Sequence, residues 1–195
     1  NKFFLWHTWF SDVFNREEGK NGFDIVIGNP PYIGEKGHKE IFQPVKSDIH
    51  LGQYYLGKMD YFYFFFHLAF NMLSPHGVAT FITTNYYPTA LGARRLRADI
   101  KDRMSIKTLF NLGELRLFEN APGQHNMISS FAKGKDGCKC QVIDVHKKGA
   151  LNPLMFTSII SRKDEDTAYA DVAHEDLYDG EENYIRLQNS SGDNP

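Results

Sequence analysis

Apolar side chains recur along this chain with two different periods. Near the start they lie three and four residues apart, at Phe3, Trp6, Trp9, Phe10, Val13 and Phe14. That spacing predicts an amphipathic helix. Residues 23–28 form instead a short continuous apolar run between turn signals, and this pattern predicts a strand that is buried on both faces, as in parallel sheets.

The chain then alternates expected helices and strands. Helices are expected at 60–73 and 89–104, and strands at 77–85, 106–112, 127–133 and 140–146. Between the first strand and the next helix, residues 34–53 are polar and rich in Gly, Lys and His, which predicts a long loop, and loops of this length are often functional or mobile. The alternation predicts an α/β architecture, in which ligands bind at the carboxyl ends of strands.

Composition narrows the class of protein. A chain of 195 residues with 42% hydrophobic residues can bury the core of one domain. The net charge of −2 lacks the basic excess of many nucleic-acid-binding modules, so such a partner must be argued from local residues. No apolar run reaches the roughly 20 residues of a membrane span and no signal peptide is visible, so no membrane partner is expected.

The two cysteines bear on location and on metals. Cys138 and Cys140 lie one residue apart, which makes no disulfide framework and suits a reducing compartment. We therefore expect a cytoplasmic protein. The pair has no second pair or nearby histidine at zinc spacing, so no metal site is expected.

The stretch "FDIVIGNPPY" places candidate chemistry at the end of the first predicted strand. Proline lacks a backbone N–H, so Pro30 and Pro31 end the strand and hold the backbone extended. Asn29 offers a side-chain carbonyl, Pro30 a main-chain carbonyl and Tyr32 a flat aromatic face. Two acceptors beside a stacking platform match an exocyclic amine on a planar base. The alternative is a rigid turn in which Tyr32 only packs on the core.

Three stretches in order resemble one family. "FDIVIGNPPY" resembles motif IV of the S-adenosylmethionine-dependent amino methyltransferases. "GKMDYFYFF" followed by "LSPHGVATFIT" is similar to the TaqI-like, or gamma-class, adenine-N6 DNA methyltransferases, and "LGELRLFENAPGQHNMISSFAKG" resembles their motif VIII. The resemblance covers about residues 20–135. It departs from the family at Thr84, where proline usually precedes the asparagine.

The resemblance implies a fold and a set of roles. It implies a Rossmann-like methyltransferase sheet in which Asn29 and Pro30 hold the amine of an adenine flipped out of double-stranded DNA, while Tyr32 stacks on the base. Phe118 would form a second wall of the base pocket, and Phe65 would lie against the adenine ring of S-adenosylmethionine. Judged without the family, Phe65 is more simply a core residue of an aromatic helix.

The family also places its glycine-containing cofactor loop upstream of the Asn-Pro-Pro-Tyr stretch, where this sequence has only 28 residues. We therefore expect the catalytic, substrate-facing half of a larger restriction-modification enzyme, without the cofactor-loop half. Residues 1–150 would be the partial catalytic domain, and residues 151–195 an acidic extension towards an absent target-recognition domain. Alone, this chain is expected to be inactive, to bind S-adenosylmethionine weakly or not at all, and to self-associate through an exposed sheet edge.

Other interpretations remain open. A methyltransferase acting on a protein glutamine or an RNA amine would use the same strand end, and a non-catalytic interaction module could keep the fold. Arg94, Arg97 and Lys101 share one helical face, which is an ordinary solvated face or a phosphate contact.

Overall fold

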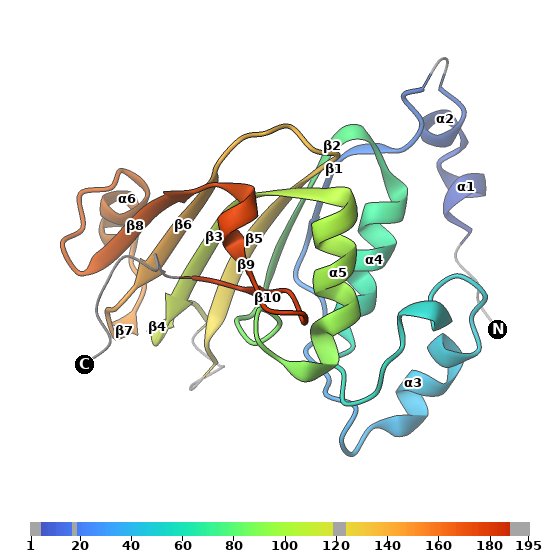
Figure 1. Cartoon of the computed structure of the whole chain (residues 1–195), viewed down its shortest axis with the longest axis horizontal. Coiled ribbons are helices and arrows are strands. Elements are labelled where there is room, and N and C mark those ends of the chain that lie inside the picture. Colours follow the sequence, from blue (N-terminus) through green and yellow to red (C-terminus); the bar gives the residue numbers. More distant parts are fainter. Residues whose placement is uncertain (1–4, 17–18, 119–123, 188–195) are drawn as a thin grey trace.

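The fold is a six-stranded mixed sheet with helices on both faces (Figure 1). It is seen in a computed structural model that describes residues 5–16, 19–118 and 124–187. In spatial order, the strands are β1 (Phe23–Gly28), β2 (Leu73–Thr84), β5 (Asn126–Lys133), β3 (Met104–Gly113), β6 (Cys140–Val145) and β8 (Thr167–Val172). The expected α/β class is confirmed.

Strand directions bring four carboxyl ends to one edge of the sheet. β1 pairs with β2 in parallel, and β3 pairs with β6 in parallel. β5 is antiparallel to both β2 and β3, and β8 is antiparallel to β6. β1, β2, β3 and β6 therefore run in the same direction and end at the same edge, where ligands bind in open α/β sheets. We call this the carboxyl edge.

The alternation of side chains along the strands separates two cores. Leu109 and Val142 face a cluster covered by α4 (Phe62–Met72) and α5 (Arg94–Arg103), which lie side by side in Figure 1. Phe110 and Ile143 face the other way, into a smaller cluster under α6 (Pro153–Ile160). Such a three-layer arrangement follows from the two-residue period of strands.

Aromatic packing holds α4 on the sheet. The sequence of α4 has no Gly or Pro, and most of its side chains are buried. The Phe66 ring stacks on Phe81 at 4.6 Å between centroids and meets Phe131 edge-on at 5.4 Å. Burial of each such ring contributes about 1.5 to 3 kcal/mol.

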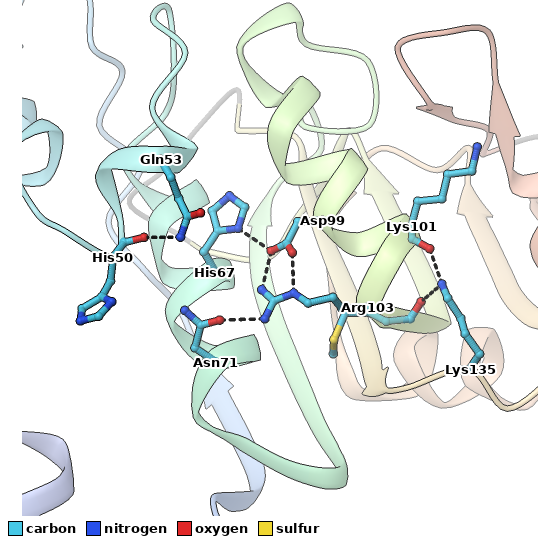
Figure 2. Close-up of polar contacts among 9 residues, drawn as sticks. His50, Gln53, His67, Asn71, Asp99, Lys101, Arg103 and Lys135 are labelled. Carbon is cyan, nitrogen blue, oxygen red and sulfur yellow. Dashed lines mark hydrogen bonds and ion pairs between the residues drawn. The ribbon is translucent and has the colours of Figure 1, made fainter.

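A polar network joins α4 to α5 (Figure 2). His67 is fully buried, and its Nδ1 lies 2.6 Å from Asp99 Oδ2, while the ring of Tyr54 stacks on it at 3.6 Å. Arg103 donates to both oxygens of Asp99, and also to Asn71 Oδ1 at 2.7 Å. Burial lowers the pKa of His67 despite the carboxylate, so a neutral imidazole donates to Asp99 and the charge of Arg103 balances that carboxylate.

The first part of the chain differs from the sequence prediction in two ways. The expected N-terminal helix is two short ones, α1 (Trp6–Trp9) and α2 (Ser11–Phe14), because Phe10 between them leaves helical geometry at φ −118° and ψ 43°. The expected loop at 34–53 contains α3 (Lys39–Lys46) and the 3₁₀ turn η1 (Gly52–Tyr54). α3 forms although Pro44 lies inside it, since it buries Phe42 and Val45.

The prediction that β1 is buried on both faces was wrong. β1 is an edge strand of the described sheet, and Ile25 and Ile27 are 69% and 78% exposed. Trp6 of α1, Phe14 of α2 and Phe10 between them pack their rings against Phe23 at the start of the strand.

The basic face of α5 is solvated at Arg94 and Lys101 but not at Arg97. Arg97 is fully buried and donates to the carbonyls of Tyr87, Ala90 and Glu182 at 2.6 to 3.0 Å. Arg94 pairs with the Glu182 carboxylate and Lys101 donates to Asn183. These cations hold the C-terminal segment on the domain.

Residues after 150 fold against the sheet as far as they are described. They form α6, β8, the 3₁₀ turn η3 (His174–Leu177) and a small hairpin of β9 (Tyr178–Asp179) and β10 (Tyr184–Ile185). The domain boundary at residue 150 and an onward recognition domain stay predictions.

Within the described ranges, no helix combines the length and apolar character needed to cross a membrane. Across those same residues, no group of three or more His, Cys, Asp or Glu side chains is placed to hold a metal ion.

Candidate functional site

Asn29, Pro30 and Pro31 follow directly on β1 at the carboxyl edge. β1 ends at Gly28, where a Cβ atom would lie 2.9 Å from the Phe81 ring, so glycine lets the strand approach the core closely here. The two prolines cannot donate to a ladder, and the parallel pairing with β2 stops at Gly28. The segment leaves the sheet without regular secondary structure, and Asn29 is exposed while Pro30 is buried.

Two carbonyl oxygens in this segment can accept hydrogen bonds. Asn29 Oδ1 already accepts from the Tyr32 hydroxyl at 2.7 Å, which fixes the orientation of the amide and leaves one lone pair. No donor to the Pro30 carbonyl is present among the described residues. The arrangement can bind a group with two N–H donors.

Tyr32 is held between the site and the core. Its ring is half-buried and meets Phe62 edge-on at 5.9 Å, and its hydroxyl also lies 3.0 Å from the carbonyl oxygen of Ile82. Burial and the nearby Asp60 carboxylate raise the pKa of Tyr32 to about 12, so the hydroxyl stays protonated and can donate to Asn29.

A pocket of about 300 Å³ brings Asn29, Pro30 and Pro31 together with Phe65. Its other walls are apolar and come from α1, β1, β2 and α4, and include Trp6, Val26, Leu68 and Phe81. Phe65 is only half-buried, unlike most residues of α4. A flat apolar ring therefore fits beside the strand end. We call this the β1 pocket.

Phe118 does not line the β1 pocket. It follows β3 and the short β4 (Leu115–Arg116) and lines a separate hollow of about 300 Å³ with Leu117 and Leu151, close to β7 (Gly149–Ala150). Residues 119–123, which complete its loop, lie outside the described residues. Phe118 thus shares the carboxyl edge with Asn29, but the structure does not bring the two into one pocket.

Sequence reasoning missed a polar chain at the carboxyl edge. Asn85 donates to Asn111 at 2.9 Å, and Asn111 donates to Asp144 at 2.7 Å. These residues lie just after β2, near the end of β3 and near the end of β6, and they line a hollow of about 350 Å³. Each is a polar residue at the end of a predicted strand, and that position was the available signal.

The fold is that of restriction-modification methyltransferase subunits. A modification subunit of a putative type I restriction enzyme from Vibrio vulnificus YJ016 has a TM-score of 0.58 at 14% identity, over 89% of this chain and 38% of that one. A type I methyltransferase subunit from Streptococcus thermophilus has a TM-score of 0.55 at 16% identity, over 84% of this chain and 36% of that one.

Residues 1–118 match the Eco57I restriction-modification methylase family, and the chain belongs to that family. Type II methyltransferase M.HincII of Haemophilus influenzae is 26% identical over 133 residues, which are 68% of this chain. M.HindII of the same species matches to the same extent. The chain spans about a quarter of the length of these curated relatives.

Membership of a restriction-modification methylase family confirms the broad resemblance. Specificity for the N6 amine of adenine and the roles of Asn29, Pro30, Pro31, Tyr32, Phe65 and Phe118 stay predictions.

Proposed function

We propose that this chain is the substrate-facing part of a DNA methyltransferase that transfers a methyl group from S-adenosylmethionine to the N6 amine of a flipped adenine. The observation that carries the proposal is the pair of carbonyl acceptors at the end of β1, next to an apolar pocket walled by Phe65. The natural protein would serve a restriction-modification system in the cytoplasm.

The chemistry follows from these groups. The lone pair of an adenine amine is delocalised into the ring, so the nitrogen is a poor nucleophile. The two N–H groups of this amine would donate hydrogen bonds to Asn29 Oδ1 and to the Pro30 carbonyl oxygen. These bonds would localise the lone pair on the nitrogen and aim it at the sulfonium methyl group. Catalysis would then be positioning and electrostatic stabilisation, without a strong base. Tyr32 orients Asn29, and Phe118 would close on the base from the following loop.

S-adenosylmethionine would place its adenine ring against Phe65. Apart from the Asn29 side chain, the β1 pocket is built from apolar residues, so it offers little to the cofactor's ribose and methionine groups. We propose that the natural protein supplies those contacts and target recognition from segments beyond this sequence. The isolated chain would then bind the cofactor weakly or not at all, and would self-associate along β1, where Ile25 and Ile27 are exposed.

The natural protein is expected to methylate adenine in DNA. The test is to express it in cells that lack DNA methylation and to map modified bases by sequencing that reports N6-methyladenine. Methylated adenine in one recurrent sequence supports the proposal and gives the target site. Unmodified DNA, together with methylated glutamine or methylated RNA, would support the alternative substrates instead.

Tyr32 variants are expected to separate stacking from orientation. Tyr32→Ala should weaken binding of a duplex with a mismatched, easily extruded target base by about 1 to 3 kcal/mol, the usual contribution of base–aromatic stacking. Tyr32→Phe keeps the ring and its edge contact with Phe62 but loses the bond to Asn29, so methyl transfer should slow while this binding is retained.

Fluorescence anisotropy, single-turnover methylation and melting temperature distinguish these effects. If Tyr32 only packs on the core, Tyr32→Ala would lower stability by about 3 to 5 kcal/mol, and the affinity of the folded protein for the mismatched duplex would not change.

A further inference from the structure

A hollow of about 620 Å³ lies next to the Asn-Pro-Pro-Tyr segment. Its lining comes from the segment between Tyr32 and the start of α3, from the turn before α4 and the first turn of that helix, and from the turn after β2. It includes Lys36, Lys39, Lys58, Asp60, Tyr63 and Tyr86. We call it the lysine hollow. The chemistry proposed for the β1 pocket does not use it.

Backbone bonds tie the lysine hollow to the proposed base site. Ile33, which follows Tyr32, donates its N–H to Asp60 Oδ1 at 3.0 Å and accepts from the N–H of Tyr61 at 2.8 Å. Gly34 and Asp60 also form an isolated antiparallel β-bridge through their backbones. The hollow therefore begins two residues after the proposed stacking tyrosine, and these bonds fix its position relative to that residue.

The lysine hollow is cationic. Lys36, Lys39 and Lys58 are exposed, and within the described ranges none of the three forms an ion pair. Of the two carboxylates in the lining, Glu35 is paired with Lys46 at 3.6 Å, and Asp60 accepts from a backbone amide. The chain as a whole carries a net charge of −2, so this concentration of positive charge is local.

The backbone of Lys58 is held in an unusual conformation. Its φ of +52° lies in the left-handed region that disfavours residues with a side chain. Two contacts maintain it. The Lys58 N–H donates to the buried Glu35 carboxylate at 2.6 Å, and Gly92 packs so closely that a Cβ there would lie 2.1 Å from the Lys58 carbonyl oxygen. Backbone strain of this kind collects at functional sites.

We propose that Lys58, with Lys36 and Lys39, binds the phosphodiester backbone of the strand whose base occupies the proposed site. This inference rests on the proposed function and adds the group that positions its substrate. Ammonium groups contact phosphates without reading sequence, and such contacts fix the register of a protein on DNA. The short connection to Tyr32 would set the phosphate at a fixed distance from the base that stacks there.

The first test is the salt dependence of DNA binding by the natural protein. Loss of one phosphate contact reduces the slope of log affinity against log salt by about 0.7 to 0.9. We expect that reduction for Lys58→Gln, which keeps the N–H bonded to Glu35. Lys139→Gln is the matched control, because Lys139 is exposed at the opposite edge of the sheet, just before β6. An unchanged slope for Lys58→Gln would overturn the proposal.

A second test locates the contact. The wild type should bind a duplex with one neutral methylphosphonate beside the mapped target adenine more weakly than it binds unmodified DNA. Lys58→Gln should bind the two duplexes equally well. If the methylphosphonate and the Lys58→Gln substitution each lower the affinity and the two losses add, the assignment is overturned. If Lys58→Gln folds poorly, the double variant Lys36→Gln, Lys39→Gln takes its place in both tests.

Two controls separate this inference from its alternatives. The first control is competition with bound DNA. If ATP displaces the DNA as well as a short oligonucleotide does, and no longer does so with Lys58→Gln, the hollow is a mononucleotide site and the proposal is overturned. The binding tests do not require methyl transfer. If Lys58→Gln reduces the salt slope but the natural protein modifies no DNA, the phosphate site is supported and the proposed function is refuted. If the natural protein methylates DNA but Lys58→Gln leaves the slope unchanged, the proposed function is supported and the phosphate site is refuted.

Discussion

Replacement of Asn29 by alanine is expected to lower the rate of methyl transfer by about a hundredfold or more in the natural protein. The magnitude follows from the loss of a positioned hydrogen-bonding group at a reacting centre. The fold should survive, because Asn29 is exposed beyond the last paired residue of β1 and bonds only to the Tyr32 hydroxyl among the described residues. That hydroxyl retains the Ile82 carbonyl as a partner.

The measurement is single-turnover methylation of a duplex with the mapped target, alongside thermal melting. Asn21→Ala is a matched control, since Asn21 is an exposed asparagine at the amino end of the same strand. Wild-type methylation by Asn29→Ala at an unchanged melting temperature would remove Asn29 from the mechanism.

Replacement of Arg97 by methionine is expected to destabilise the fold by about 3 to 5 kcal/mol, the usual consequence of breaking a buried charged contact. The substitution removes donors from three carbonyl groups, of Tyr87, Ala90 and Glu182. It also removes the cation 4.7 Å from the Tyr184 ring. The hairpin of β9 and β10 should detach first, because Arg97 is one of its main attachments.

Urea unfolding measures the loss, and protection of residues 178–185 from hydrogen exchange reports the detachment. Arg94→Met serves as the control. Its ion pair with Glu182 is exposed, so its removal should change stability by less than about 1 kcal/mol. Equal effects of the two substitutions would show that burial of Arg97 does not determine the stability of this region.

Local pattern predicted most of the sheet, and long-range contacts explain what it missed. The strands at 127–133 and 140–146 have clear apolar runs and were placed within one residue. β8, with the sequence TAYADV, has no such run, because it is an edge strand that depends on its pairing with β6. α3 is only eight residues long, its apolar side chains are limited to Ile41, Phe42 and Val45 apart from Pro44, and this proline lies inside it, so its sequence indicated a loop.

The part of the candidate site whose residues are consecutive in the sequence could be predicted. Asn29 to Tyr32 form one motif, so their chemistry could be argued together. Asn85, Asn111 and Asp144 come from three strands, and only the fold brings them within hydrogen-bond distance. The left-handed backbone of Lys58 likewise depends on Glu35 and Gly92, which are far from it in sequence.

The position of β5 has a consequence for how the chain is synthesised. β5 lies between β2 and β3 but follows both in the sequence. When they leave the ribosome, β2 can therefore pair only with β1, and β3 has neither of its neighbours β5 and β6. A nascent chain that ends before residue 126 exposes one unpaired edge of β2 and both edges of β3. Unpaired strands of this kind make partly synthesised chains prone to aggregate. Only when residues 126–133 have emerged can β5 join the β1–β2 pair to β3, so this segment links the two halves of the sheet.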